Sequence, residues 1–274
     1  MLRLLQIELI KLWNSKSSRI LIITYFILLT FLSLISAIRI KIGSIDFLLA
    51  DQGIFNFPFI WHFNTYIAIH FKLFLAIIIV SMIASEYSNK TLKQNLIDGL
   101  SKREFILSKF LTILLFATIS TLVVFVISLI LGGIYSVYDE IGIIFSDMEY
   151  LIAYFLNLVG FFSICLFFAV LTRKSAFALG FLVIWFIGES IFSAILNYKL
   201  ESLKFLVDFF PLQAISNLLK EPFTRLSAIK TAVEQVAQGF DKDYTLQLQD
   251  AVTVMGWTVI FVTLSYYLIK RRDL

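Results

Sequence analysis

The sequence predicts an all-α integral membrane protein with six transmembrane helices, and three observations lead to this prediction. Hydrophobic residues make up 59% of the chain and charged residues only 15%, whereas soluble domains average roughly 45–50% and about 25%. Several segments are also long and apolar enough to span a bilayer, which takes about 20 helical residues. Lys and Arg, finally, are concentrated in alternate connecting segments, as the positive-inside rule requires.

The predicted spans are distributed along the whole chain. With the N-terminus in the cytoplasm, the inner segments carry fourteen Lys or Arg residues, and the short outer loops carry only Arg39 and Lys41. This bias places both termini in the cytoplasm. It also accounts for the net charge of +4, so no nucleic-acid partner is expected. The six spans cover approximately residues 20–38, 61–85, 108–135, 150–171, 175–196 and 250–269.

Residues 1–16 predict an amphipathic helix that lies in the inner membrane interface. One face of this helix would be apolar, with Trp13 at the level of the lipid headgroups. Such a helix is either a simple surface anchor or a lever joined to the first span, and the sequence favours neither. The apolar face would contain Leu2, Leu5, Leu9, Leu12 and Trp13, and the opposite face Arg3, Gln6, Lys11 and Asn14.

The inner loop of residues 86–107 is longer than a connector needs to be. Leucines recur every four residues, at 92, 96 and 100, which places them on one face of a short cytoplasmic helix. Gly99 can take the left-handed conformation that ends a helix. Ser101, with Glu104 three residues later, predicts a capping box that starts a new helix leading into the third span. An apolar stripe facing the cytoplasm is costly unless it is covered, so this is either an interfacial helix or a docking helix for a partner.

The outer segment of residues 197–249 is the largest aqueous part of the chain. Residues 203–219 are apolar for this position but too short to span twice, which predicts a pair of re-entrant or interfacial helices. The remaining expectations are a short helix over residues 226–238, an extended piece over 244–249, and Asp250 as the cap of the last span.

Motifs for catalysis and for metal binding were sought and not found. Glycine never precedes lysine, so the chain has no P-loop for ATP phosphates. Cys165 is the one cysteine, which excludes a disulfide framework and a cysteine-based zinc site. His62 and His70 lie on the outer part of the second span without a convergent Cys or carboxylate, so no metal site is expected.

Two charged residues lie inside predicted spans. Lys72 is about 20 Å and Glu189 about 21 Å from the inner surface, at about 1.5 Å per residue. An unpaired charge at such a depth costs about 2.5–3.5 kcal/mol on insertion scales. Lys72 and Glu189 therefore either pair in the outer half of the membrane, within one chain or between two copies, or each reaches a polar headgroup or an aqueous vestibule of its own.

The loop and the topology together resemble the six-span permease subunits of ABC-2 type transporters. Relatives often have Gly-Thr before the short helix and Pro before the serine, where this chain has Lys90-Thr91 and Gly99-Leu100-Ser101. The resemblance extends to the Phe210-Pro211-Leu212 stretch and the basic tail, and so covers essentially the whole chain. The matching residues of the loop are Glu86, Thr91, Leu92, Leu96, Gly99, Ser101, Arg103 and Lys109.

The resemblance implies a permease, more often an exporter, in the plasma (inner) membrane of a prokaryote. The chain would then have no catalytic residue and no cofactor, because ATP and Mg would be bound by two copies of a separate ABC ATPase. A second permease copy, identical or not, and an extracytoplasmic accessory protein are the other expected partners. The ATPase would contact the loop at Glu86, Thr91, Leu92, Asn95, Leu96, Gly99, Leu100, Ser101 and Arg103.

Two other classes of function remain open on the sequence alone. A secondary carrier, or a non-catalytic scaffold of an envelope complex, would work without an ATPase. An intramembrane enzyme would need several titratable residues at one depth, and the spans offer only Lys72, Glu189 and His70. The transported substrate is not determined, because every membrane span is apolar.

Overall fold

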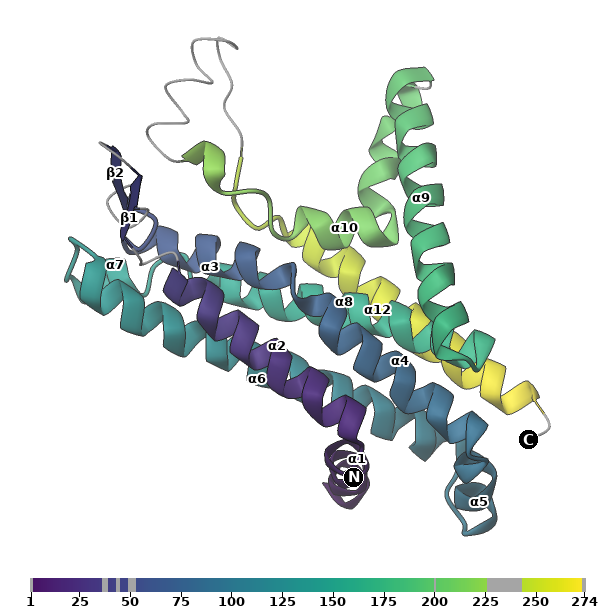
Figure 1. Ribbon diagram of the computed structural model, residues 1–274. Helices are drawn as coiled ribbons and strands as arrows, with labels where there is room; N and C mark the ends of the chain where they lie inside the picture. The colour runs from purple at the N-terminus through teal and green to yellow at the C-terminus, as the bar shows by residue number, and fades with distance from the viewer. Residues whose placement is uncertain are drawn as a thin grey trace.

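The computed structural model describes residues 2–35, 39–42, 45–48, 53–199, 201–225 and 243–272, and these are almost entirely helical (Figure 1). Four helices in the described part are long and apolar enough to cross a membrane, and the bent pair α3–α4 would be a fifth. The elements are α1 (Leu2–Asn14), α2 (Lys16–Ile35), β1 (Arg39–Ile42), β2 (Ile45–Leu48), α3 (Phe59–Ile69), α4 (Lys72–Ser88), α5 (Thr91–Ile97), α6 (Lys102–Tyr135), α7 (Ile141–Ile144), α8 (Glu149–Thr172), α9 (Ser175–Lys199), η2 (Glu201–Phe209), α10 (Pro211–Asn217), η3 (Phe223–Arg225) and α12 (Leu248–Arg271).

Helix α8 is the centre of the bundle. It packs against α3, α4, α6, α9 and α12, and 72% of the most apolar window of the segment that contains it is buried. Helix α9 is the opposite case, since only 6% of its window is buried, and it stands away from the bundle in Figure 1. A helix that is apolar on all sides and uncovered by protein is stable only in lipid or against a partner.

Polar side chains join the helices inside the bundle. The hydroxyls of Tyr25 on α2 and Tyr154 on α8 are 3.1 Å apart, and the side chain of Asn64 on α3 donates to Ser128 on α6 at 2.9 Å. Buried donors and acceptors of this kind must find partners within the protein, because lipid supplies none. They fix how α2, α3, α6 and α8 are placed around one another.

The second predicted span is broken rather than continuous. Helices α3 and α4 meet at an angle of 46°, although no proline or glycine lies between them. The backbone hydrogen bonds there span three residues instead of four: the N–H of His70 donates to the carbonyl of Ile67, and the N–H of Phe71 donates to the carbonyl of Ala68. The Nδ1–H of His70 donates to the carbonyl of Tyr66. This bond stabilises the Tyr66 carbonyl, which the break leaves without the backbone N–H that would bond to it in a continuous helix. The segment predicted as the second span, residues 61–85, thus contains a bend that the sequence does not predict.

The inner loop has the predicted helix–turn–helix form. Gly99 has φ of +97°, the left-handed region that favours glycine. Ser101 and Glu104 form the complete capping box at the start of α6. From that cap α6 runs without a break for 34 residues, about 51 Å at about 1.5 Å per residue. The predicted capping box and the helix that leads from it toward the third span are confirmed.

The outer end contains short elements. Strands β1 and β2 pair antiparallel, with Arg39 opposite Leu48, in a loop for which the sequence analysis predicted no structure. The predicted helix pair over residues 203–219 is present as η2 and α10, and Pro211 begins α10. Asp250 was predicted to cap the last span, but the cap position of α12 is Gln247, and Asp250 lies in its first turn. The helix predicted over residues 226–238 lies outside the described residues.

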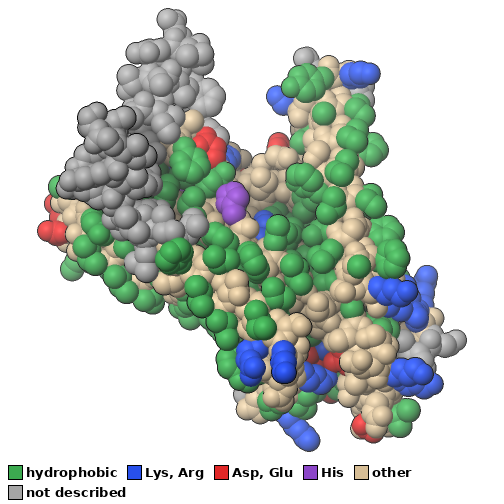
Figure 2. All heavy atoms as spheres, in the orientation of Figure 1, with side chains coloured by type: hydrophobic (Ala, Val, Ile, Leu, Met, Phe, Trp, Pro, Cys, Tyr) green, Lys and Arg blue, Asp and Glu red, His purple; other side chains and the backbone are tan. Residues whose placement is uncertain are grey.

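The two ends of the molecule differ in charge. Helices α1 and α5 and both chain ends lie at one end, opposite the hairpin and α7 (Figure 1). Figure 2 shows much of the visible Lys and Arg colour at that same end, below a belt of hydrophobic side chains. The structure thus gathers many of the basic side chains at one end of the helices.

Candidate functional site

Helix α5 turns its leucines toward its own chain. Leu92 is 2% exposed and belongs to the hydrophobic core, while Leu96 and Leu100 are half-buried against that core. The end of the bundle thus buries Leu92 and partly covers Leu96 and Leu100, so this stripe is not a free apolar face. The exposed side of α5 consists instead of Lys93, Gln94, Ile97 and Asp98, with Ile97 76% exposed.

Glu86, near the end of α4, connects α5 to two other helices. One of its carboxylate oxygens accepts from the Oγ1 of Thr91 at 2.9 Å and from the Nδ2 of Asn95 at 3.3 Å, both on α5. The other oxygen contacts the ammonium groups of Lys11 on α1 at 2.8 Å and of Lys109 on α6 at 2.9 Å. Glu86 is only 3% exposed. One buried carboxylate therefore joins α1, α4, α5 and α6.

The second carboxylate of this site is Glu8 on α1. It forms an ion pair with Lys109, whose side chain is fully buried, and Lys11 lies 3.5 Å from its other oxygen. We call Glu8, Lys11, Glu86 and Lys109 the charge cluster; Glu8, Glu86 and Lys109 are buried, and the side chain of Lys11 is 39% exposed. The two carboxylates and two ammonium groups of the cluster balance, which a buried site requires because an unpaired charge there is costly.

Sequence analysis did not identify Glu8 as part of a site. The signal was present: Glu8 is the one acidic residue of the otherwise basic and apolar N-terminal helix. A carboxylate within an amphipathic helix usually lies on the solvated face of that helix, so no local pattern places Glu8 inside the protein. The buried partner Lys109 lies 101 residues further along the chain, beyond the reach of any local pattern.

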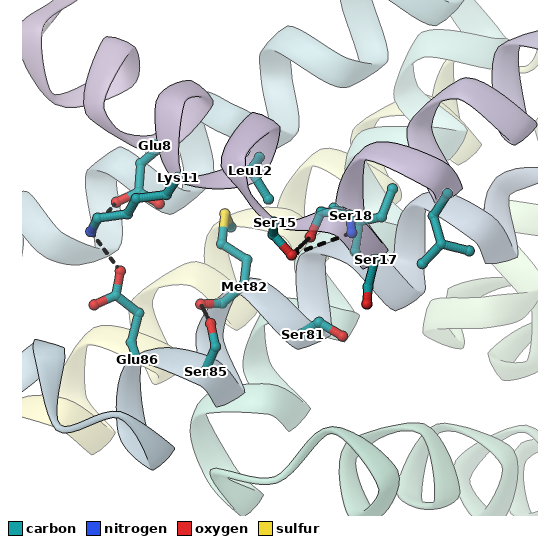
Figure 3. Close-up of a pocket in the computed structure, with 12 residues that line it drawn as sticks. Glu8, Lys11, Leu12, Ser15, Ser17, Ser18, Ser81, Met82, Ser85 and Glu86 are labelled. Carbon is teal, nitrogen blue, oxygen red and sulfur yellow. Dashed lines mark hydrogen bonds and ion pairs between the residues drawn. The ribbon is translucent and has the colours of Figure 1, made fainter.

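Figure 3 shows Lys11 between the two carboxylates at the edge of a pocket. Burial by itself lowers the pKa of Lys11, but Glu86 and Glu8 together raise it above its ordinary value, so the ammonium stays charged at physiological pH. The pocket has a volume of about 270 Å³ and lies between α1, α2 and α4. Five serine hydroxyls line it, from Ser15, Ser17, Ser18, Ser81 and Ser85. Beside this pocket the ion pair of Lys11 with Glu86 joins α1 to α4.

The apolar residues of α1 face in different directions. Leu12 is 4% exposed and packs inward, whereas Leu9 and Trp13 are exposed and Leu5 is half-buried. The predicted single apolar face is thus divided between the protein and the outside. Exposed Ile7, Leu9, Ile10 and Trp13 form a surface suited to lipid.

The remaining loop residues lie around the start of α6. Ser101 accepts the backbone N–H of Glu104 as part of the cap, and Arg103 is exposed. Lys102 donates to the carbonyl of Arg272 at 3.0 Å, and Arg272 in turn donates to the carbonyls of Val170 and Leu171 at the end of α8. Residues of the basic tail are thus bound to the ends of α6 and α8.

Lys72 and Glu189 do not pair within the chain. The ammonium of Lys72 donates to the side-chain carbonyl of Asn157 at 2.9 Å and lies 4.5 Å from the centre of the Phe161 ring. Glu189 accepts from the indole N–H of Trp185 at 2.9 Å and from the backbone N–H of Gln213 at 2.7 Å. The prediction of a pair within one chain was wrong, because each charge has neutral hydrogen-bond partners of its own. Pairing between two copies stays a prediction.

The two histidines also have separate environments. The Nε2 of His62 lies 2.7 Å from the carbonyl of Lys220, and its ring stacks on Tyr150 with centroids 4.1 Å apart. His70 contacts the backbone at the break between α3 and α4. In the described part of the chain, no three His, Cys, Asp or Glu side chains are grouped as a metal ion requires.

The apolar helices define a multi-pass membrane protein. The charge cluster and the short helix α5 lie together at the basic end of these helices. A family model described as ABC-2 family transporter protein matches residues 16–274. The chain therefore belongs to the ABC-2 transporter family, as the membrane component of an ABC transporter, and the resemblance seen in the sequence is confirmed. Members of this family are not themselves catalytic and imply an ABC ATPase partner. No curated protein matches the chain.

Proposed function

We propose that this protein is the permease of an ATP-driven exporter in a prokaryotic plasma membrane. Two copies of a separate ATPase, which bind ATP and Mg, act on α5, and two permease copies form the pathway. The spans are α2, α3–α4, α6, α8, α9 and α12, with both chain ends in the cytoplasm. Support comes from the family match, from the 20-residue length of α2 and from the basic end in Figure 2.

The observation that carries the proposal is the position of Glu86. Its carboxylate binds α5 through Thr91 and Asn95 and α1 and α6 through Lys11 and Lys109. A push on α5 by a closing ATPase therefore moves α1, α4 and α6 together rather than bending one loop. Small shifts at such a joint change the packing of whole helices, because packed helices move between discrete arrangements.

The docking surface in this proposal is the exposed side of α5. Ile97 is the large hydrophobic side chain on that side and is 76% exposed, with Lys93, Gln94 and Asp98 around it. An exposed apolar residue with a polar rim is typical of the centre of a contact. The leucines hold α5 on the permease, and Ile97 meets the ATPase.

The test is to purify the tagged permease in mild detergent from its native membranes and to identify the polypeptides that co-elute. We expect a stoichiometric subunit with a P-loop. We then expect Ile97→Asp to abolish its co-elution, because it places a charge in the apolar centre of the contact. The control is Val137→Asp, at a position beyond α6 that is 80% exposed, which should leave co-elution unchanged.

Two results would count against the proposal. If the folded permease co-elutes with no ATPase, a carrier or scaffold function becomes the better explanation. If Ile97→Asp retains the ATPase at wild-type stoichiometry, the docking surface lies elsewhere.

A further inference from the structure

Two pockets meet at Glu189, between α9 and α10. The first has a volume of about 460 Å³ and is lined by five aromatic rings. The second has a volume of about 390 Å³ and is lined mainly by polar residues. Glu189 lines both. The aromatic rings belong to Phe168, Phe181, Trp185, Phe192 and Phe210, and the polar groups to Ser190, Ser193, Asn197, Tyr198, Gln213 and Ser216.

Among the residues that the structure describes, no Lys or Arg pairs with Glu189. Its two hydrogen-bond donors, the indole of Trp185 and the backbone of Gln213, are both neutral. In the part of the chain that the structure describes, the ion pairs of Lys and Arg are made with Glu8, Glu86 and Asp147, and none with Glu189. A negative charge thus remains at the junction of an aromatic pocket and a polar one.

The aromatic rings are arranged as a group. Phe168 stacks on Phe181 with centroids 6.3 Å apart, and its ring lies 5.8 Å from that of Trp185. The faces of such rings attract cations, and a carboxylate next to them adds a full opposite charge. Phosphate or carboxylate headgroups would be repelled by Glu189, so the charge selects one class of ligand.

We propose that this junction binds an amphipathic organic cation, with its ammonium or phosphonium group at Glu189 and its apolar part in the aromatic pocket. This inference rests on the proposed function, because it names the substrate class of the exporter. Glu189 lies about 21 Å along α9 from Ser175, at about 1.5 Å per residue. The ligand would therefore enter from the outer half of the bilayer, beside a helix that the rest of the chain leaves uncovered.

The test is equilibrium binding of radiolabelled tetraphenylphosphonium to the full-length permease in lipid nanodiscs. Empty nanodiscs give the amount that partitions into lipid alone. We expect saturable binding above this level, and no competition by tetraphenylborate, which has the same shape and the opposite charge. Glu189→Gln should weaken binding at least tenfold. Glu149→Gln is the matched control, because it removes an exposed carboxylate at the start of α8.

A second variant keeps the test decisive if Glu189→Gln disturbs the attachment of α10. Gly188 lines the aromatic pocket, and a Cβ placed there meets no atom within 4 Å. Gly188→Leu places its side chain at the pocket from a position where the Cβ has room, and we expect it to abolish saturable binding. Gly180→Leu, also on α9 with open space around it, should bind as the wild type does.

Three results would overturn the proposal: binding no greater than in empty nanodiscs, wild-type affinity in both Glu189→Gln and Gly188→Leu, or equal competition by the borate. If Gly188→Leu instead changes the oligomeric state and the wild type binds no phosphonium, the pocket belongs to an interface between copies. Binding needs no ATPase, so failure here leaves the coupling at α5 intact. Conversely, loss of ATPase co-elution leaves this measurement unaffected.

Discussion

At the scale of single residues, Lys109 is the most demanding position in the chain. Its ammonium is fully buried and lies between the carboxylates of Glu8 and Glu86. The charged form of Lys109 is stable only while both carboxylates stay in contact with it, because burial has removed the water that would otherwise solvate the ammonium. The same dependence makes the cluster a sensitive joint, since any movement of α1 or α4 changes the balance of charges around Lys109.

Lys109→Met should destabilise the protein by about 3–5 kcal/mol, the usual cost of leaving a buried charge without its partner. Here two carboxylates would be left with only Lys11 between them. The measurement is unfolding by denaturant in detergent micelles. Lys93→Met, at an exposed position of α5, should change stability by less than about 0.5 kcal/mol.

The double variant Glu8→Gln with Lys109→Met removes one charge of each sign. We expect it to recover most of the stability lost in Lys109→Met alone, because Glu86 then keeps Lys11 as its partner. Additive losses in this cycle would mean that Glu8 and Lys109 do not interact.

At the scale of elements, the turn between α5 and α6 depends on the backbone of Gly99. A left-handed residue with a Cβ costs roughly 1–2 kcal/mol, and φ at Gly99 is +97°. Gly99→Ala should therefore shift or loosen α5 while α6 stays folded, since the added methyl group itself meets no atom within 4 Å. Reduced ATPase co-elution, with little change in the melting temperature, is the expected result. Gly133→Ala, in open space within α6, should change neither the ATPase co-elution nor the melting temperature.

The crossing of α8 and α12 depends on a glycine for a different reason. A Cβ on Gly160 would lie 2.7 Å from the Cγ1 of Val254 on α12. Gly160→Ala should therefore push the helices apart and cost about 1–3 kcal/mol, as overpacking does. Gly256→Ala, on α12 with nothing within 4 Å, is the matched control. Equal melting temperatures for the two variants would show that this contact is not tight.

At the scale of the whole molecule, the arrangement of the helices predicts which end faces the cytoplasm. With Cys165 changed to Ala, a cysteine can be placed on either end: Lys93→Cys on α5, or Val137→Cys beyond α6, where Val137 is 80% exposed. A membrane-impermeant maleimide should label Val137→Cys in intact cells and Lys93→Cys only after the membrane is opened. Labelling of both from the same side would contradict six spans with cytoplasmic ends.

Local sequence patterns were enough to predict much of this molecule. The assignment to the class of membrane proteins follows from hydropathy, because a long apolar segment is stable in lipid wherever it occurs in the chain. The capping box at Ser101 and the left-handed Gly99 follow from residue types a few positions apart, because caps and turns are local structures. The family resemblance at the inner loop rested on the same short-range information, and the family match agrees with it.

Only the tertiary structure decided which residues far apart in the chain are in contact. Glu8 meets Lys109 across 101 residues, and Glu189 meets Gln213 instead of Lys72. The direction of the Leu92 stripe and the bend at His70 likewise depend on what packs beside them. The period of a helix shows which residues share a face, but not whether lipid, water or another helix covers it, and that choice is made by the packing of the whole bundle.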